Sequence, residues 1–462
     1  MSRLKIVWPT LVLLPLAFLF SQGGGSITQQ YKETADKLIA AALADHDGYN
    51  KLAYLCDRIG HRLSGSPALE QAVIWSAAQM KRDGLENVVT PAVKVPHWVR
   101  GRENAEITAP VKRRLTMLAL GGSVATPSQG ITAEVVPVGS FDELQKAGRA
   151  KIAGKIVLFN VPYEGYGKTV QYRGVGASRA AALGAVAMLL RSVGSLTQQT
   201  PHTGMMMYLP DAPKVPAAAI TAEDALMIQR LSDSGDKVTV HLFMEAHMEP
   251  DADSANVIGE IRGREKPEEI VVMGGHLDSW DVGQGAQDNG SGCIASLQAV
   301  ALIKKLGLRP RRTLRVVFFT NEENGLAGGR AYRDWVGARV NNHVAAIEMD
   351  GGAEKPLGFG FGMAPGPQSE RALAKAREIG RLLKSIGADS MTPGGGGGDI
   401  SPVMEAAVPG FGMNTVGVHY FDWHHTPADT IDKIKPEEFQ QNIAALAVLS
   451  YVLADMPDRL VE

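Results

Sequence analysis

The sequence is poor in cysteine. Only Cys56 and Cys293 occur among 462 residues, and they lie far apart in the chain. So few cysteines exclude a disulfide-stapled fold and a cysteine-rich zinc site. We interpret both as small, buried, apolar residues. Any bound metal must therefore be held by histidine and carboxylate side chains.

The sequence also lacks an excess of charge of one sign. Lys and Arg number 47 against 49 Asp and Glu, a formal net charge of -2. No basic field exists to hold a phosphate backbone, so we expect no nucleic-acid partner. A content of 45% hydrophobic and 21% charged residues excludes a disordered chain, and the length predicts two or three domains. The 51 glycines and 25 prolines favour an α/β enzyme.

The apolar run at the N-terminus is too short to be a typical membrane span. It covers residues 6–20, follows Arg3 and Lys5, and falls short of the roughly 20 residues that a spanning helix needs. This pattern predicts a secretory signal over residues 1–22 and an extracytoplasmic protein, periplasmic or secreted. Retention of the segment as an N-terminal anchor is the alternative. Without such retention we expect no membrane partner.

Two kinds of pattern alternate along the remaining chain. Residues 27–108 and 246–462 are interpreted as the two parts of one catalytic domain, and residues 109–245 as a smaller α/β insert. The insert has no cluster of ionisable residues, so we interpret it as a structural lid or a dimerisation module. The expected elements are helices at 27–43, 52–59, 67–80, 177–183 and 222–231, and strands at 88–95, 155–160, 185–190 and 215–220.

The second part of the catalytic domain reads as buried strands separated by helices such as 292–306. The strand runs are 255–261, 269–273, 313–319 and 344–349, all rich in β-branched residues. We predict an α/β fold with a mixed, mostly parallel sheet flanked by helices. In such sheets ligands bind beyond the carboxyl ends of the strands.

Histidines and carboxylates follow these runs one after another. One such residue alone is usually a helix cap. Here a histidine or carboxylate follows an apolar run four times in succession, which helix capping does not explain. We interpret the group as a two-zinc site, because imidazole and carboxylate ligands suit zinc and a bridging carboxylate relieves the repulsion between two dications. The proposed ligands are His276 and Asp350 for one ion, Glu323 and His425 for the other, and Asp288 as the bridge.

Three neighbouring residues have expected roles beside the ligands. Glu322 is the candidate general base, taking the proton from a zinc-activated water and returning it to the leaving amine. Asp278 is either an acceptor that orients the imidazole of His276 or a turn-forming residue. His424 is expected to stabilise the oxyanion, although His424 and His425 could exchange roles.

Several segments together resemble the co-catalytic zinc aminopeptidase family. They are residues 274–290, the Thr-Asn-Glu-Glu block at 320–323, Met349-Asp350, and His-His-Thr-Pro-Ala-Asp-Thr at 424–430. The insert resembles a protease-associated domain through Gly-Lys-Ile-Val-Leu-Phe at 154–159 and Pro-Ala-Ala-Ala-Ile at 216–220. The resemblance implies the metal and base roles given above, two zinc ions per subunit, short peptide substrates and a homodimer. Residues 205–208, Met-Met-Met-Tyr, offer an adaptable apolar surface for that contact.

The sequence departs from the family at three places. Asn289 stands where close relatives have a second Asp, and His424 stands where the wider family often has Tyr. The glycine run 394–398 is longer than the family loop, and we expect it to be a mobile wall of the substrate cleft. Asp399, which follows it, either binds the substrate's amine or stabilises a turn.

The function that these observations predict is a zinc exopeptidase acting on dipeptides or short peptides, with the recognised free end left open. A catalytically inactive, receptor-like binding protein on the same fold is the alternative. Such a relative would lack Glu322 or one of the five ligands, and all of them are present here. A one-zinc acyl transferase, such as a glutaminyl cyclase, is disfavoured by the number of ligands.

Overall fold

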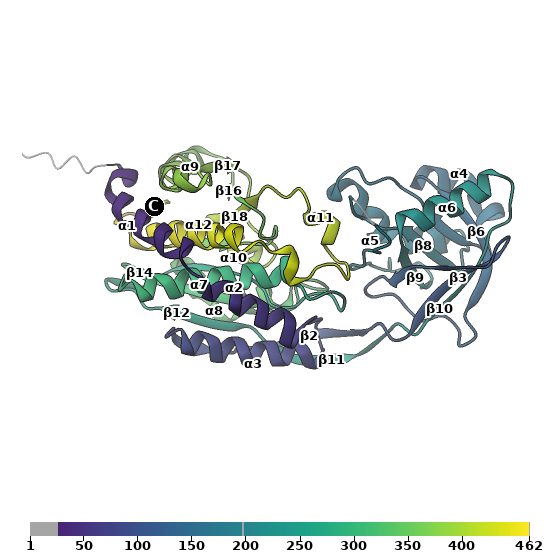
Figure 1. Ribbon diagram of the computed structural model, residues 1–462, viewed down its shortest axis with the longest axis horizontal. Coiled ribbons are helices and arrows are strands. Elements are labelled where there is room, and N and C mark those ends of the chain that lie inside the picture. The colour runs from purple at the N-terminus through teal and green to yellow at the C-terminus, as the bar shows by residue number, and fades with distance from the viewer. Residues whose placement is uncertain (1–25, 196–197, 462) are drawn as a thin grey trace, which may run out of the picture.

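The computed structural model describes residues 26–195 and 198–461 and has two lobes of unequal size (Figure 1). The larger lobe carries both ends of the described chain, and the smaller lobe is the insert. The expected signal segment, residues 1–22, lies outside the described residues. Within the described part, no helix combines the length and apolar character that crossing a membrane requires.

The larger lobe is built on a mixed sheet of 8 strands. Its middle strands β14, β13, β15 and β18 run parallel, so their carboxyl ends share one edge. Strand β12 pairs antiparallel with β14, and β16 pairs antiparallel with β18. In spatial order the strands are β1 (Glu86–Val89), β12 (Val257–Ile261), β14 (Arg312–Phe319), β13 (Lys266–His276), β15 (His343–Glu348), β18 (Gly410–Thr415), β16 (Pro356–Gly362) and β17 (Ser390–Pro393).

Helices cover both faces of this sheet, because its strands are apolar on both sides. Val271 and Met273 pack into the core under α7 and α12, whereas Ile270 and Val272 pack on the other face against α8 and α10. The fully apolar strands therefore mark a sheet buried between two helical layers. The helices of this lobe are α1 (Ile27–Leu43), α2 (Asp47–Tyr54), α3 (Pro67–Arg82), α7 (Ser291–Lys305), α8 (Ala327–Val336), α9 (Pro367–Gly380), α10 (Ser401–Met404), α11 (Tyr420–Trp423) and α12 (Pro436–Asp455). The larger lobe also contains short 3-10 or π turns at Leu55–Ile59, Ala286–Gly290, Gly337–Asn342, Arg381–Ile386 and Ile431–Lys433.

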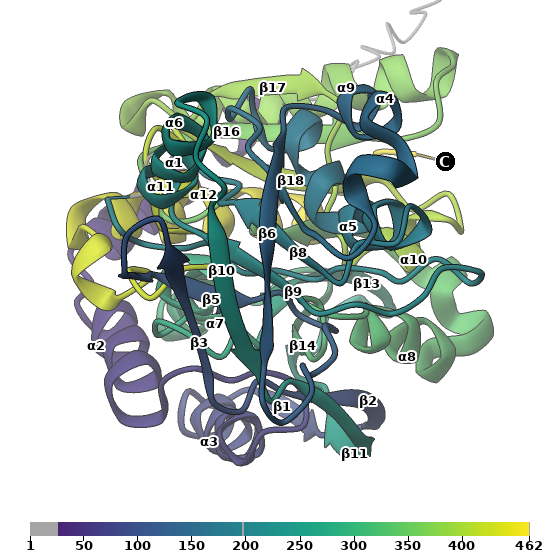
Figure 2. The ribbon, with the colours of Figure 1, turned by 90° about the vertical axis from the view of Figure 1, so that its right-hand side faces the viewer.

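The insert contains a second sheet of 8 strands, seen face-on in Figure 2. Strands β6, β7, β8 and β9 are parallel, and helices α4 (Phe141–Ile152), α5 (Tyr166–Ala182) and α6 (Ala222–Asp233) connect or cover them. The strand order is β4 (Arg113–Leu115), β3 (Glu103–Ala109), β10 (Thr239–Met244), β6 (Ile131–Val138), β7 (Ile156–Phe159), β8 (Ala187–Arg191), β9 (Ala217–Ile220) and β5 (Met117–Ala119).

A two-stranded ribbon joins the lobes. It pairs β2 (Ala92–Val99) with β11 (His247–Ala255) in antiparallel fashion, and the chain enters and leaves the insert side by side along it (Figure 1). The strands of the insert thus run from Glu103 to Met244, whereas the sequence analysis placed the insert at 109–245.

The structure confirms the mixed, mostly parallel sheet and refines two expected elements. The single strand expected at 88–95 is two strands, β1 and β2, because Pro91 lacks the amide that would continue the ladder. The helix expected at 177–183 begins much earlier, at Tyr166, where the glycines of Tyr166–Ala182 had obscured the helical pattern. Both cysteines are buried and free, as expected.

Candidate functional site

His276 is the last residue of β13, and its buried imidazole points to the carboxyl edge of the sheet. The ring Nδ1 lies 3.0 Å from the main-chain oxygen of Asp278 and 3.7 Å from its carboxylate. The expected orientation of His276 is therefore set mainly by the backbone of Asp278. The following loop is fixed by Arg62, whose buried guanidinium donates to the carbonyls of Leu277 (2.7 Å) and Gly285 (3.0 Å).

The carboxylate of Asp278 has a second role that the sequence did not suggest. It accepts from the amides of Glu322 at 3.0 Å and Glu323 at 3.2 Å, across the gap between the ends of β13 and β14. Glu323 is thereby turned toward Asp288 and His425, while Glu322 lies half-buried beside them. By holding both backbone amides, the Asp278 carboxylate lets the side chains of Glu322 and Glu323 take different positions.

Asp288 lies in the turn before α7, at the centre of the group. Asp429 holds this turn, because its carboxylate accepts from the amides of Gln287 at 2.7 Å and Asp288 at 3.2 Å. Burial is the main cause that raises the pKa of Asp429 to about 7. Asp429 belongs to the 424–430 motif, but no role was predicted for it. Its position four residues after His425 was the feature of the sequence that could have indicated one.

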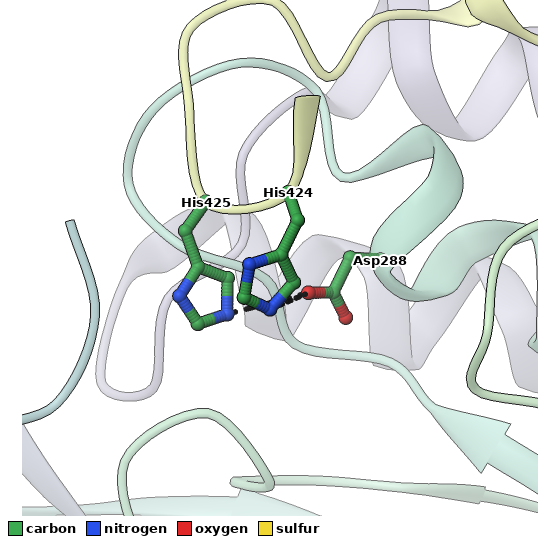
Figure 3. A group of neighbouring side chains, drawn as sticks. All are labelled: Asp288, His424 and His425. Carbon is green, nitrogen blue, oxygen red and sulfur yellow. Dashed lines mark ion pairs between the residues drawn. The ribbon is translucent and has the colours of Figure 1, made fainter. Parts of the chain in front are cut away.

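His424 and His425 follow α11 and stack on each other with ring centroids 3.5 Å apart, both facing Asp288 (Figure 3). The Nε2 atom of His425 lies 3.0 Å from Glu323 Oε2 and 3.3 Å from Asp288 Oδ2. The Nε2 atom of His424 lies 3.5 Å from Asp288 Oδ2, and its Nδ1 is buried without a partner among the described residues. The geometry therefore favours His425 over His424 as the ligand next to Glu323.

The five expected ligands converge on one small volume. On the other side of Asp288, the Nε2 atom of His276 lies 3.1 Å from Asp288 Oδ1 and 3.2 Å from Asp350 Oδ1. Asp288 is thus the shared member of two groups, one with His276 and Asp350 and one with Glu323 and His425. This is the arrangement that a bridging carboxylate requires.

The electrostatics of the group favour a cation. Burial and the neighbouring Asp288 raise the pKa of Glu323 to about 7. Burial opposes a charge on His425, but Glu323 and Asp288 outweigh it and raise the pKa of His425 to about 10. Crowded carboxylates that pull protons onto imidazoles are equally able to hold metal ions in their place.

The donor set fits zinc. Two ligands that each lie about 2.0–2.2 Å from one tetrahedral ion are roughly 3.3 Å apart. The nitrogen-to-oxygen distances around Asp288 are 3.1–3.3 Å for His276 and His425. His276, Asp288 and Glu323 also meet the geometric criteria of a metal-binding group, as do Asp288, His424 and His425.

A cavity of about 340 Å³ opens onto this group, and the insert forms part of its wall. From α5 come Tyr166 and Arg173, and from α11 come Tyr420 and Phe421. Tyr166 stacks on Phe421 with centroids 5.0 Å apart, so the two lobes meet in an aromatic contact. The sequence analysis missed Tyr166 and Arg173, because no pattern in the insert marks which of its residues reach the other lobe.

Arg173 is buried where the two lobes meet. Its guanidinium donates to the Tyr166 hydroxyl at 2.6 Å and to the carbonyl oxygen of Thr203 at 3.2 Å, and it lies 3.4 Å from His425 Nδ1. Among the described residues, these contacts and the Met205 carbonyl are its partners, and none is a carboxylate.

Asp399 does not reach the cavity. Its side chain is fully buried, both carboxyl oxygens lack a hydrogen-bond partner within the described chain, and burial followed by Glu348 raises its pKa well above the usual range. The chain turns inward here because Gly329 packs on the Asp399 backbone. We therefore do not retain Asp399 as a substrate-binding residue. The glycine run before it contributes only Gly398 beside the site, where a Cβ would lie 2.9 Å from Glu322 Oε1.

Fold and site together define a metallopeptidase with a protease-associated insert, and comparisons with known proteins agree. The model of peptidase family M28 matches residues 256–450, and that of the PA domain matches residues 128–228. Carboxypeptidase Q of Mus musculus is 42% identical over 433 residues, which cover 93% of this chain and 91% of that protein. Carboxypeptidase Q of Homo sapiens is 43% identical over 417 residues, covering 90% of this chain and 87% of that protein.

Solved structures show the same architecture. A peptidase M28 precursor from Shewanella amazonensis superposes with a TM-score of 0.89 at 34% identity, covering 94% of this chain and 99% of that chain. A zinc aminopeptidase from Bacillus subtilis superposes with a TM-score of 0.63 at 22% identity over 90% and 96% of the two chains, a likeness of fold. The chain belongs to peptidase family M28, in the group of carboxypeptidase Q, and carries an inserted PA domain.

Proposed function

We propose that the protein is a zinc-dependent exopeptidase that hydrolyses dipeptides or short peptides. The observation that carries this proposal is the clustering of His276, Asp288, Glu323, Asp350 and His425 beside one cavity, which all of them except His276 line. Two zinc ions per subunit fit the division of these ligands around Asp288. When bound, the ions supply Lewis acidity that activates water and polarises the scissile carbonyl.

Glu322 is the general base in this proposal. It lines the cavity beside the ligands, is half-buried and makes no ion pair among the described residues, and Asp278 fixes its backbone. A carboxylate so placed takes a proton from the attacking water and returns it to the leaving amine. The neutral imidazole of His424, whose pKa burial lowers well below the usual value, lines the same wall and supports an oxyanion contact.

We further propose that the site reads the free carboxylate of the substrate through Arg173. A buried cation without a carboxylate partner is costly, and an anionic substrate group would relieve that cost. The other charged residues of the cavity are carboxylates that surround the metal group, so Arg173 is the wall residue suited to an anion. The cavity volume of about 340 Å³ suits a dipeptide or a short chain end, and the insert across it supports the exclusion of folded proteins.

Two further expectations remain proposals. The basic start and apolar run of residues 1–22 support an extracytoplasmic location. A homodimer is also proposed, but residues 205–208 support it less than expected, because Met207 is 59% exposed whereas Met206 is buried.

Metal removal combined with substrate profiling tests the proposal. Protein depleted of metal by a chelator should lose dipeptide hydrolysis and regain it with zinc, with elemental analysis confirming each state. Free dipeptides should be cleaved, N-acetylated dipeptides should remain substrates, and C-amidated ones should be cleaved only at a low residual rate. Full activity after verified metal removal would reject zinc catalysis. No cleavage of any peptide by the zinc-loaded protein would instead make the inactive binding protein the better interpretation.

A further inference from the structure

Trp280 belongs to the metal-bearing loop by sequence but to the insert by packing. It follows His276 by four positions, is 2% exposed, and lies in the hydrophobic core formed by the insert strands. Its ring contacts Trp98 of the connecting ribbon, with centroids 6.4 Å apart. Gly121 of the insert packs closely against it, since a Cβ there would lie 2.0 Å from the Trp280 ring. The loop after His276 is therefore anchored in the other lobe.

The Trp280 ring also lies beside one residue of the metal group, His425. Its centroid lies 5.6 Å from that of the His425 ring, with the planes tilted by 57°. One indole thus touches both the core of the insert and a metal ligand. A shift of the insert cannot leave the environment of His425 unchanged.

The next residue, Asp281, strengthens the contact between this loop and the insert through an ion pair. Its carboxylate accepts two hydrogen bonds from Arg100 at the end of the ribbon, one of them 2.7 Å long from Nε. Arg100 also donates to the Ala119 carbonyl of the insert at 2.7 Å. Both charged groups are mostly buried, with side chains 11% and 19% exposed, so this pair is stronger than a surface ion pair.

Thr203 links the insert directly to the backbone of His425. Its hydroxyl donates to the Ala119 carbonyl at 2.7 Å and lies 3.4 Å from Arg100 Nη2, and its amide donates to the His425 carbonyl at 2.9 Å. The backbone of His425 is in the left-handed region, with φ at 60°, a conformation that needs such external support.

We propose that Trp280, Asp281, Arg100 and Thr203 form a joint that holds His425 in place only while the insert is docked, so that the insert controls the Glu323–His425 metal group. These are positioning residues, because they act through His425. The His276–Asp350 group contacts no part of this joint in the residues described above and is held by the central sheet. Undocking the insert thus loosens one metal group and spares the other. This inference rests on the proposed two-zinc function.

Zinc retention in joint variants tests the inference. Asp281→Asn breaks the ion pair between Asp281 and Arg100, and Arg100→Met breaks it together with the 3.6 Å ion pair between Arg100 and Glu103. Arg102→Met is the matched control. Arg102 also lies in the connection and pairs with Glu245 at 2.6 Å, but its side chain is 84% exposed and that pair lies away from the metal group. Zinc per chain is measured over time in a weak competing chelator, alongside the thermal unfolding midpoint.

In the expected result, either joint variant releases one of two zinc ions at least tenfold faster than wild type, and the double variant is no worse than Arg100→Met alone. The second ion and the behaviour of Arg102→Met should match wild type. Wild-type retention of both ions in Asp281→Asn, which preserves side-chain shape and so avoids a folding defect, would overturn the inference. A wild-type protein that never takes up two zinc ions would instead reject the proposed function.

Discussion

The two sheets of this protein have similar size and parallel centres, yet only one carries chemistry at its strand ends. In the catalytic sheet, β13 ends at His276, β14 is followed by Glu322 and Glu323, and β15 by Asp350. In the insert, the equivalent parallel strands are followed by Gly139, Asn160, Ser192 and Thr221. The α/β architecture supplies an edge where ligands can converge, and the residue types placed there decide whether it becomes a site.

The insert contributes in a different way. Its side chains reach the cavity from α5, and Thr203 reaches the His425 backbone from a loop, both at its border with the catalytic lobe. In the proposed function, the catalytic sheet positions the reacting groups. The insert supplies part of the cavity wall, a guanidinium without a carboxylate partner among the described residues, and support for His425. Changes at the strand ends of the first sheet should affect chemistry, and changes in the insert should affect recognition or retention.

The largest expected effect is the loss of the base. Glu322→Gln should lower kcat by roughly 10²–10⁴, the range for removing a general base, with normal zinc content. Its neighbour provides the matched control, since Glu323→Gln removes a ligand 3.0 Å from His425 and should lower zinc content as well. Kinetics together with elemental analysis distinguish the two. Equal metal loss in both variants would show that the adjacent glutamates do not have separate roles.

Acid should weaken the catalytic lobe through His343. This imidazole is buried, accepts from the Tyr332 hydroxyl (2.8 Å apart), and has its pKa lowered to about 4, mainly by burial and then by Arg315. The unfolded chain, with a histidine pKa near 6.5, binds this proton first. Stability is therefore full above about pH 6.5 and falls by up to about 3 kcal/mol as the pH drops to about 4.

Denaturant titrations across this pH range measure the effect. The difference between wild type and His343→Gln should shrink as the pH falls, because glutamine does not titrate. Parallel pH profiles of the two proteins would contradict the role given to His343.

Arg173 should affect recognition more than chemistry. Arg173→Met removes the guanidinium, and hydrogen bonds to charged groups contribute about 1.5–3 kcal/mol. We expect kcat/KM for free dipeptides to fall about 10- to 100-fold, mostly through KM, while residual cleavage of C-amidated peptides stays constant. Arg179→Met in the same helix is the control, because Arg179 packs over Phe141 away from the cavity. An equal loss for both kinds of substrate would mean that Arg173 does not read the carboxylate.

The sequence was sufficient for the catalytic sheet and for the clustering of histidines and carboxylates at its strand ends, because both depend on local patterns. Apolar strands followed at once by His276, Glu323 or Asp350 place those side chains at a common edge whatever the rest of the fold does. The helix carrying Tyr166 and Arg173 was expected only at 177–183, because glycines in its first half hide the periodicity.

What could not be predicted depends on contacts between the lobes. Nothing local shows that Arg173 approaches His425, or that Trp280 packs into the core of the insert. The opposite case is Asp399, whose position after a glycine run suggested contact with the substrate's amine or a turn-stabilising role. Tight packing of Gly329 against its backbone, a property of the folded state, buries it instead. Residues whose environment comes from distant segments are those that sequence patterns place worst.

The smallest expected effect is a gain in stability within the insert. Gly174 lies inside α5 with a helical backbone, and a Cβ added there would meet nothing within 4 Å. Gly174→Ala should therefore stabilise the protein by about 0.5–1 kcal/mol, because alanine loses less backbone entropy in a helix. Gly292 in α7 has no such room, since its Cβ would lie 2.0 Å from the Met349 carbonyl oxygen beside the metal ligand Asp350. Chemical unfolding should show the gain at Gly174 with zinc content unchanged. A loss of stability there would mean that the first half of α5 is held more tightly against the catalytic lobe than its packing indicates.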